Sequence, residues 1–295
     1  MRASVLCVTH NNLSMVDDLL RGIEAQGDSI AEVSIVDNGS SDGTDAALER
    51  RREEFIYPLS VVSGENIGFA SGVNAALDQL SVDCDALLVL NPDVVLVEGI
   101  VAKMLSLLEC VPNAGIITAP LTLRSGEEDP ASRRRLPALT SSVLYATLGR
   151  WTPKAARYNS IESNSGHGCV VRGLAYSKLE ATTGALMLIS PTFRTAASGI
   201  FDTDYWMYGE DLQLCADACD EGRSVLMLEQ PGSIHVKGAS SGLPRGRRSD
   251  RAFHNALYLY YVKNLRRNEV ERVIVFLAIG TRFCFSRLWS IMPWH

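Results

Sequence analysis

The chain has 295 residues, 46% hydrophobic and 21% charged, which is enough to bury a large core in one domain or two small ones. Its formal net charge is −6, and we expect no nucleic-acid partner. The seven cysteines are scattered and form no CxxC pair, so a disulfide framework and a zinc cluster are both disfavoured and a reducing cytoplasm is indicated. The opening "MRASVLCVTHNN" is too short in apolar residues for a signal peptide and is interpreted as a first strand.

Strand and helix patterns alternate through the first half of the chain. Residues 4–10 form a short apolar run, and a helical pattern with one apolar face follows over 13–23. The same unit recurs over 31–44 and over 59–77, and residues 85–96 open with a fourth strand. Continuous apolar strands separated by helices predict a parallel sheet that is covered on both faces.

Polar residues follow these strands where each one ends. Asp37 ends the second strand, residues 64–66 follow the third, and Asn91 and Asp93 follow the fourth. Pro92 ends the hydrogen-bonding ladder at the same point. Ligands of such sheets bind beyond the carboxyl ends of the strands, so we expect these groups to gather at the mouth of a site. Taken singly, each turn also fits a plain loop or helix entry.

The middle segment, residues 121–178, breaks the alternation and is rich in turn-forming residues. We interpret it as a partly ordered excursion over the active face and not as a second domain. It contains three consecutive arginines, Arg133, Arg134 and Arg135. They fit either a solvated loop or a contact for a phosphate-bearing substrate.

The chain returns to the sheet at residues 181–190, and "FDTDYWMYGEDLQLC" follows. Here Glu210 and Asp211 come directly after the aromatic residues Tyr205, Trp206 and Tyr208, at the start of a predicted helix. Simple capping of the helix dipole would explain the two acids but not the aromatics. Aromatic rings beside a carboxylate suit stacking on a sugar, and a carboxylate near apolar rings can act as a general base.

The C-terminal tail is basic although the whole chain is acidic. Its apolar run, residues 273–294, is interrupted by Arg282 and Arg287 and holds Trp289 and Trp294. A spanning helix would be penalised by a central arginine, whereas a helix lying on an anionic membrane surface would not. A helix docked on the protein's own core is the alternative.

Several motifs together resemble family 2 glycosyltransferases of the GT-A fold, in the branch of rhamnosyltransferases and galactofuranosyltransferases. They are, in order, "VTHNN", "VDNGSSDGT", "ENIGFASGVN", "LNPDVVL", "RRRLP", "TTGALMLI", "FDTDYWMYGEDLQLC" and "IHVKGASS". The resemblance implies an α/β fold, a single Rossmann-like domain with a mainly parallel central sheet flanked by helices. We expect this domain over 1–245, with a nucleotide-binding half (1–120) and an acceptor half (121–245), and a C-terminal helical segment over 246–295.

The resemblance also implies a set of site residues. The acid Asp37 would meet the nucleotide base, Asp93 would hold the metal with His235, and Asp211 would be the general base, with Glu210 next in line. Asn91 stands where the family's metal motif has its first acid, and would contact the ribose or diphosphate. The nucleotide-sugar set comprises Thr9, Asn11, Asp37, Asn38, Asn66, Gly68, Phe69, Asn74, Asn91 and Asp93, and the acceptor set comprises Trp206, Tyr208, Arg245 and Arg248.

By the same resemblance, the chain is expected to be an inverting enzyme that uses Mg²⁺ or Mn²⁺. The expected donor is dTDP-rhamnose first and UDP-galactofuranose second, and the acceptor is a glycan or a polyprenyl-diphosphate-linked glycan. The expected location is cytoplasmic, peripheral on the inner face of the cell membrane. A nucleotidyltransferase is a rival, but it should carry a basic glycine-rich loop where this chain has "THNN". A non-catalytic nucleotide-sugar-binding domain is the other rival, supported only by the missing first acid in "NPD".

Overall fold

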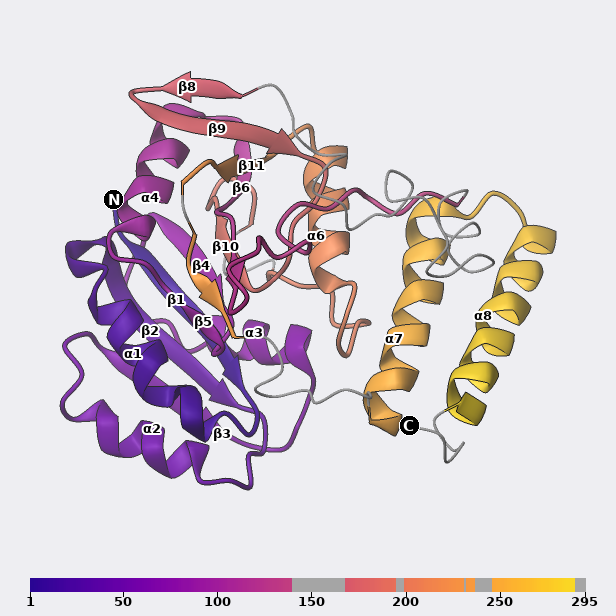
Figure 1. Ribbon diagram of the computed structural model, residues 1–295, viewed down its shortest axis with the longest axis horizontal. Coiled ribbons are helices and arrows are strands. Elements are labelled where there is room, and N and C mark those ends of the chain that lie inside the picture. The colour runs from indigo at the N-terminus through magenta and orange to yellow at the C-terminus, as the bar shows by residue number, and fades with distance from the viewer. Residues whose placement is uncertain (140–167, 195–198, 231, 237–245, 290–295) are drawn as a thin grey trace.

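The computed structural model describes residues 1–139, 168–194, 199–230, 232–236 and 246–289 (Figure 1). Strands and helices alternate first: β1 (Ala3–Thr9), α1 (Val16–Glu24), β2 (Ile30–Asp37), α2 (Thr44–Arg52), β3 (Leu59–Ser63), α3 (Phe69–Leu77), β4 (Ala86–Leu90), β5 (Val94–Val95), α4 (Ile100–Cys110), β6 (Ala114–Thr118) and β7 (Thr122–Leu123). Then follow β8 (Cys169–Val171), β9 (Leu174–Leu179), β10 (Leu186–Ile189), α6 (Glu210–Asp220), β11 (Ser224–Leu228), β12 (Ile234–His235), α7 (Arg247–Tyr260) and α8 (Glu269–Trp289).

The main sheet has nine strands in the order β3-β2-β1-β4-β10-β6-β11-β9-β8. The first four are parallel, as the sequence predicts, and β10 and β9 run against the others. Thr9 is paired with Asp37 and Asp37 with Ser63, so the carboxyl ends of β1, β2 and β3 lie level with one another. The loops that carry the predicted nucleotide residues therefore start at one edge of the sheet.

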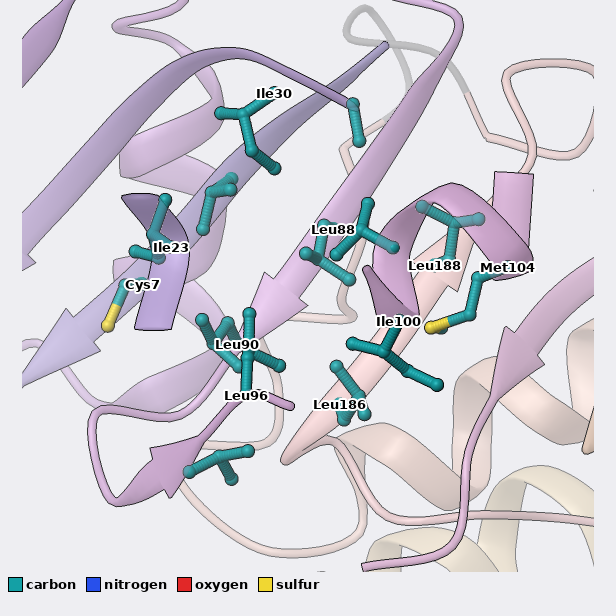
Figure 2. Packing of buried hydrophobic residues seen from close by; sticks show 14 of the residues in the cluster. Cys7, Ile23, Ile30, Leu88, Leu90, Leu96, Ile100, Met104, Leu186 and Leu188 are labelled. Carbon is teal, nitrogen blue, oxygen red and sulfur yellow. The ribbon is translucent and has the colours of Figure 1, made fainter. Parts of the chain in front are cut away.

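A hydrophobic core lies on each face of this sheet, because side chains alternate along buried strands. In β4, Leu88 and Leu90 enter the cluster under α1 and α4, while Leu87 and Val89 enter the cluster under α3 and α6. Figure 2 shows the first cluster, where Ile100 and Met104 of α4 pack toward β4 and β10. The prediction of a sheet covered on both faces is confirmed.

A second, three-stranded sheet has the order β5-β12-β7. β12 runs antiparallel to β5, with His235 opposite Val94, and parallel to β7, with His235 opposite Leu123. The backbone N–H of Val236 also donates to the carbonyl of Asp93, at 2.8 Å. This small sheet joins three segments that are far apart in the sequence, and it brings His235 beside Asp93.

The segment predicted as an excursion over the active face has another structure where it is described. β8 and β9 form a hairpin, and β9 pairs antiparallel with β11, so the hairpin completes the edge of the main sheet. Figure 1 shows it at the edge farthest from β3. Residues 140–167 of that segment lie outside the described residues. β9, LAYSKL, mixes apolar residues with Ser177 and Lys178, so it lacks the continuous apolar run of a strand such as β4.

The C-terminal segment forms a helical hairpin, α7 and α8, which lies beside α6 (Figure 1). The two helices contact each other through rings: His254 of α7 meets Phe283 of α8, and Tyr258 meets Phe276. The other side of α8 exposes large apolar side chains, among them Val273, Ile274 and Leu277. No helix within the described residues is long and apolar enough to cross a membrane.

Candidate active site

The carboxylate of Asp37 lies at the ends of β1 and β2 and is only 2% exposed. Its Oδ1 accepts hydrogen bonds from the hydroxyls of Thr9, at 2.9 Å, and of Ser40, and its Oδ2 accepts from the Ser40 N–H at 2.9 Å. Thr9 and Asp37, both predicted to contact nucleotide, are thus in contact with each other. The contact of Asp37 with the nucleotide base stays a prediction.

Two asparagines connect the neighbouring loops of this edge. The Asn38 amide donates to the Gly68 carbonyl at 2.8 Å, while Asn11 Oδ1 accepts from the Ser41 N–H at 2.8 Å. Asn11 has a φ of 55°, a left-handed conformation that asparagine tolerates better than most residues. These bonds hold the loops after β1, β2 and β3 together as one surface. The nucleotide roles of Asn11 and Asn38 stay predictions.

The N-terminus of α3 is closed by the loop that precedes α6. The Phe69 N–H donates to the Trp206 carbonyl at 2.8 Å. Gly68 has a φ of 93°, and a Cβ built there would lie 2.3 Å from that carbonyl oxygen. Only glycine allows this approach. The "ENIGF" turn of the nucleotide half and the aromatic run of the acceptor half are therefore in direct backbone contact.

Asn74 has a structural role within the described residues. Its Nδ2 donates to the Phe201 carbonyl at 2.8 Å, and its Oδ1 accepts from the N–H groups of Ile200, at 2.9 Å, and Phe201, at 3.1 Å. These bonds attach the segment before the aromatic run to α3. The prediction that Asn74 contacts the nucleotide-sugar has no support from these contacts and stays a prediction.

Asp93 and His235 form the pair predicted to hold a metal ion. Asp93 Oδ1 lies 3.5 Å from His235 Nε2, and both side chains are about nine-tenths buried. Asn91 Oδ1, two residues before Asp93, is buried and accepts no hydrogen bond from any described residue. A free acceptor needs a donor or a cation, so it suits a sugar hydroxyl or a metal ion better than a phosphate oxygen.

This donor set fits Mg²⁺ or Mn²⁺ that is held partly by substrate. No group of three His, Cys, Asp or Glu side chains in the described part of the chain could hold an ion. Mg²⁺ is usually bound through one or two carboxylates plus substrate phosphates and water, and one imidazole favours Mn²⁺ somewhat. Two ligands, Asp93 and His235, therefore suffice if a nucleoside diphosphate supplies others.

The imidazole of His235 lies between two carboxylates. Its Nδ1 is 2.8 Å from Asp129 Oδ2, and its Nε2 faces Asp93. Burial lowers the pKa of His235, but the neighbouring carboxylates of Asp129 and Asp93 outweigh burial and raise the pKa to about 9. Asp129 is completely buried. Nothing in the "SGEEDPAS" stretch distinguished it, because a run of acids in a turn reads as solvated surface.

Asp211, the predicted base, begins α6 beside Glu210. Its Oδ2 accepts from Arg134 Nη1, at 2.6 Å, and from the Gly184 N–H, at 3.1 Å. Glu210 is 6% exposed, and its Oε2 has no hydrogen-bond partner among the described residues. Burial and the charge of Asp211 raise the pKa of the Glu210 carboxyl to about 8. Asp211 is therefore the ion-paired member of the two, and the Glu210 carboxyl holds its proton more tightly than an exposed glutamate does.

For the first two residues of the arginine triplet, both interpretations are wrong: Arg133 and Arg134 are neither solvated nor free to contact a phosphate. Arg133 is 7% exposed and pairs with Glu128, at 2.7 Å, and with Glu229, at 2.6 Å. Arg134 pairs with Asp211. Basic runs usually remain in solvent, but here two of the acidic partners, Glu229 directly after β11 and Asp211 at the start of α6, are 96 and 77 residues away in the sequence. Sequence reasoning noted "RRRLP" as a motif and missed these partners.

The aromatic run is divided among three environments. Tyr205 is 1% exposed and donates its hydroxyl to Gln213, so it cannot stack on a sugar, contrary to the prediction. Trp206 lies against Gly68, with the Arg248 guanidinium 4.2 Å above its ring. Tyr208 shares a hydrogen bond of 2.6 Å with Ser249 of α7. Trp206 and Tyr208 thus connect the sheet domain to α7.

Arg248 was predicted to bind the acceptor, together with Arg245. Besides stacking on Trp206, it donates to the Asn66 carbonyl at 3.1 Å, so its charge lies beside the nucleotide turn. Asn66 Oδ1 in turn accepts from the Gly68 N–H at 3.1 Å. Arg245 lies outside the described residues. Acceptor binding by either arginine stays a prediction.

Two hydrogen bonds from backbone N–H groups connect the turn of the predicted metal ligand with the predicted base. The Asn91 N–H donates to the Ala185 carbonyl at 2.9 Å, and the adjacent Gly184 N–H reaches Asp211. Residues 4–175 match the model of glycosyl transferase family 2. The chain belongs to this family. The expectation of a glycosyltransferase is confirmed, and the missing first acid of "NPD" does not remove the chain from the family.

Relatives of this chain include two proteins from Mycobacterium tuberculosis, strains CDC 1551 / Oshkosh and ATCC 25618 / H37Rv. Each is named N-acetylglucosaminyl-diphospho-decaprenol L-rhamnosyltransferase and is 26% identical to this chain over 261 residues. The similarity covers 81% of this chain and 77% of each relative. The similarity to proteins named as rhamnosyltransferases therefore extends over most of this chain, in agreement with the expected branch of the family.

Solved structures with similar folds include the mannosyltransferase PcManGT from Pyrobaculum calidifontis in complex with GDP-Man and Mn²⁺, with a TM-score of 0.57 and 18% identity. The match covers 91% of this chain and 65% of that enzyme, a little under two thirds of its length. S. aureus TarS 1-349 has a TM-score of 0.56 and 16% identity, over 99% of this chain and 75% of TarS 1-349. At these identities the likeness shows the fold alone, and the predicted GT-A fold is confirmed.

Proposed function

We propose that this chain is an inverting, metal-dependent glycosyltransferase that adds a sugar, with L-rhamnose favoured, to a polyprenyl-diphosphate-linked glycan. The observation that supports it best is a pair of hydrogen bonds between the two ends of the site. The Asn91 N–H donates to the Ala185 carbonyl, and the N–H of the preceding residue, Gly184, donates to the Asp211 carboxylate. The turn that carries Asp93 and the buried carboxylate of Asp211 are thus attached to one short segment, as a reaction between two bound substrates requires.

The chemistry follows from these residues. Asp211 accepts the proton of the acceptor hydroxyl while that oxygen bonds to the anomeric carbon and the bond to the nucleoside diphosphate breaks. Attack from the side opposite the leaving group inverts the configuration, and no protein nucleophile takes part. Arg134 fixes the orientation of the Asp211 carboxylate through the 2.6 Å ion pair. A divalent ion held by Asp93 and His235 would stabilise the charge on the departing diphosphate.

The choice of substrates rests on the relatives. The mycobacterial relatives are named for transfer of L-rhamnose to a diphospho-decaprenol-linked acceptor, which supports dTDP-rhamnose as first donor and a lipid-linked acceptor. UDP-galactofuranose is the second donor. The metal is Mg²⁺ or Mn²⁺, and the GDP-Man and Mn²⁺ complex of the mannosyltransferase from Pyrobaculum calidifontis supports a divalent metal in general.

We also infer that the outer face of α8 rests on the inner surface of the cell membrane. Every exposed side chain described on α8 from residue 273 to 284 is uncharged, and Val273, Ile274, Phe276 and Leu277 are each more than half exposed. Arg282 is half-buried and is not part of this face, contrary to the prediction. Exposed arginines stand instead at both ends of the hairpin: Arg247 and Arg251, and Arg266 and Arg267. An anionic membrane surface would bury the apolar face of α8 among the lipid chains and place the arginines beside the anionic headgroups.

The deciding experiment is a transfer assay with purified protein. The donors are dTDP-rhamnose and UDP-galactofuranose, the acceptor is polyprenyl-diphosphate N-acetylglucosamine, and Mn²⁺, Mg²⁺ or EDTA is added. We expect rhamnosyl transfer that EDTA abolishes. Asp211→Asn should bind donor normally and lose about two to four orders of magnitude in rate, whereas Asp220→Asn, at the exposed end of α6, should not. Donor binding with no transfer to this or any soluble glycan acceptor would favour the non-catalytic reading.

A further inference from the structure

The side chain of Asp129 is the only partner of His235 Nδ1 that the described residues show, at 2.8 Å from its Oδ2. An ionised carboxylate has no hydrogen to donate, so the proton of this hydrogen bond belongs to His235 Nδ1. When a divalent ion displaces the second proton of the ring, the other nitrogen, Nε2, carries the lone pair, and this atom lies 3.5 Å from Asp93 Oδ1. This distance is long for a hydrogen bond but short enough for both atoms to reach one cation.

The Asp129 carboxylate is itself held in place. Its Oδ1 accepts from the Ala131 N–H at 2.9 Å, and its backbone N–H donates to the Leu121 carbonyl at 2.7 Å. The side chain has no solvent exposure. With one oxygen bound to Ala131, only Oδ2 is directed at His235, and the carboxylate cannot turn away without losing a buried hydrogen bond.

We propose that Asp129 is a positioning residue, which fixes the rotation and the tautomer of His235 so that Nε2 is presented with Asp93 to the divalent ion. This inference rests on the metal dependence of the proposed function. A carboxylate behind a ligating histidine is a common arrangement, and its loss typically costs 10- to 100-fold in metal affinity. The competing reading is that Asp129, His235 and Asp93 form a structural ion cluster that only joins β5, β12 and β7.

The variant Asp129→Asn distinguishes these two hypotheses, because the asparagine side chain has the same shape as that of aspartate but carries only one oxygen. If that oxygen continues to accept from Ala131, the amide NH₂ faces His235 Nδ1 and donates to it. The ring proton then moves to Nε2, the atom that must bind the metal. Glu128→Gln is the matched control, since it removes the same charge from the adjacent residue, whose carboxylate pairs with Arg133 and not with His235.

The test measures the affinity for Mn²⁺ in the presence of dTDP or UDP, by electron paramagnetic resonance of free Mn²⁺, and the ring ¹⁵N shifts of His235 with Mg²⁺ and the same nucleotide. We expect Asp129→Asn to weaken Mn²⁺ binding about 10- to 100-fold and to move the proton from Nδ1 to Nε2. Glu128→Gln should stay within about twofold of the wild type, because it does not touch the ring. A purely structural role would lower the thermal stability of Asp129→Asn and leave its Mn²⁺ affinity unchanged.

Two outcomes would overturn the inference, and they are distinguishable. Wild-type Mn²⁺ affinity in folded Asp129→Asn would remove the positioning role and leave the proposed function intact. A wild type that binds no Mn²⁺ with either nucleotide would remove both. If Asp129→Asn does not fold, the wild-type spectrum still decides: a proton on Nε2 in the presence of Mg²⁺ and nucleotide contradicts the proposal, and a proton on Nδ1 supports it.

Discussion

The guanidinium of Arg134 lies 2.6 Å from the carboxylate of Asp211, and the two side chains are only 12% and 11% exposed. They are 77 residues apart in the sequence. In a buried pair, each charge has lost much of its hydration and depends on the other. The predicted base of this enzyme is therefore held in a buried ion pair, and removal of either partner should destabilise the fold.

A double-mutant cycle should reveal this dependence. Arg134→Gln removes the cation beside the buried Asp211 carboxylate, and Asp211→Asn removes the carboxylate that Arg134 contacts, so each should lower the free energy of unfolding by about 3–5 kcal/mol. The double variant should lose clearly less than the sum, by about 1 kcal/mol or more, because the interaction between the two charges can be lost only once. Urea unfolding measures all four proteins. Additive losses would mean that the two side chains do not interact in solution.

Gly68 should tolerate no side chain. In Gly68→Ala the new Cβ would lie 2.3 Å from the Trp206 carbonyl oxygen, and the φ of 93° would be strained for alanine. We expect the Trp206 loop to separate from α3, a loss of about 1–3 kcal/mol from backbone strain alone, and weaker nucleotide binding. Gly64→Ala in the same turn is the control, because its Cβ meets nothing within 4 Å. Equal nucleotide affinity and stability in the two variants would contradict the close contact.

The buried Glu210 should make stability depend on pH. Burial and the charge of Asp211 raise its pKa to about 8 in the folded protein. The unfolded chain loses this proton near pH 4.5, whereas the folded chain keeps it until about pH 8. The folded state thus binds more protons in this window, and its stability falls as the pH rises through it, by at most about 1.4 kcal/mol per pH unit.

The comparison of wild type with Glu210→Gln isolates this effect. The glutamine variant lacks the titrating group. The difference between its free energy of unfolding and that of the wild type should therefore shift in favour of the variant as the pH rises from 4.5 to 8, and stay constant above pH 8. Urea unfolding at several pH values gives the difference. Glu54→Gln, at an exposed position, should show no such trend. A constant difference between wild type and Glu210→Gln would mean that Glu210 is ionised in the folded protein.

The outer face of α8 should be required for membrane binding. Ile274→Glu and Leu277→Glu place charges where the side chains are 61% and 60% exposed, so we expect a folded protein that no longer sediments with anionic phosphatidylglycerol vesicles. Val170→Glu, at a 71% exposed position on β8, should bind as the wild type does. High salt should weaken binding by the intact chain.

Truncation after Arg267 should likewise release the protein from vesicles while activity on a short soluble acceptor persists. Unfolding of the truncated protein would mean that α8 belongs to the core. A concentration-dependent dimer that Ile274→Glu dissociates, with no vesicle binding by the wild type at low salt, would mean that a second copy and not lipid covers this face.

The sequence alone determined the parallel half of the sheet and the edge at which the site forms. Continuous apolar strands such as β4 can only be buried on both faces, and polar residues that end them, such as Asp37 and Asp93, must then meet at one edge. The start of α6 at Glu210 followed in the same way from local signals. These features depend on neighbours in the chain, which a sequence displays directly.

Only the tertiary structure decided which charges meet. Arg134 reaches Asp211, Asp129 reaches His235 across 106 residues, and Tyr205 is buried instead of facing a sugar. The strand β12, two residues long, brings His235 to Asp93, and no periodicity predicts so short a strand. Ion pairs and short strands gain their free energy from partners distant in the sequence, so their residues carry no local pattern that distinguishes them from solvated turns.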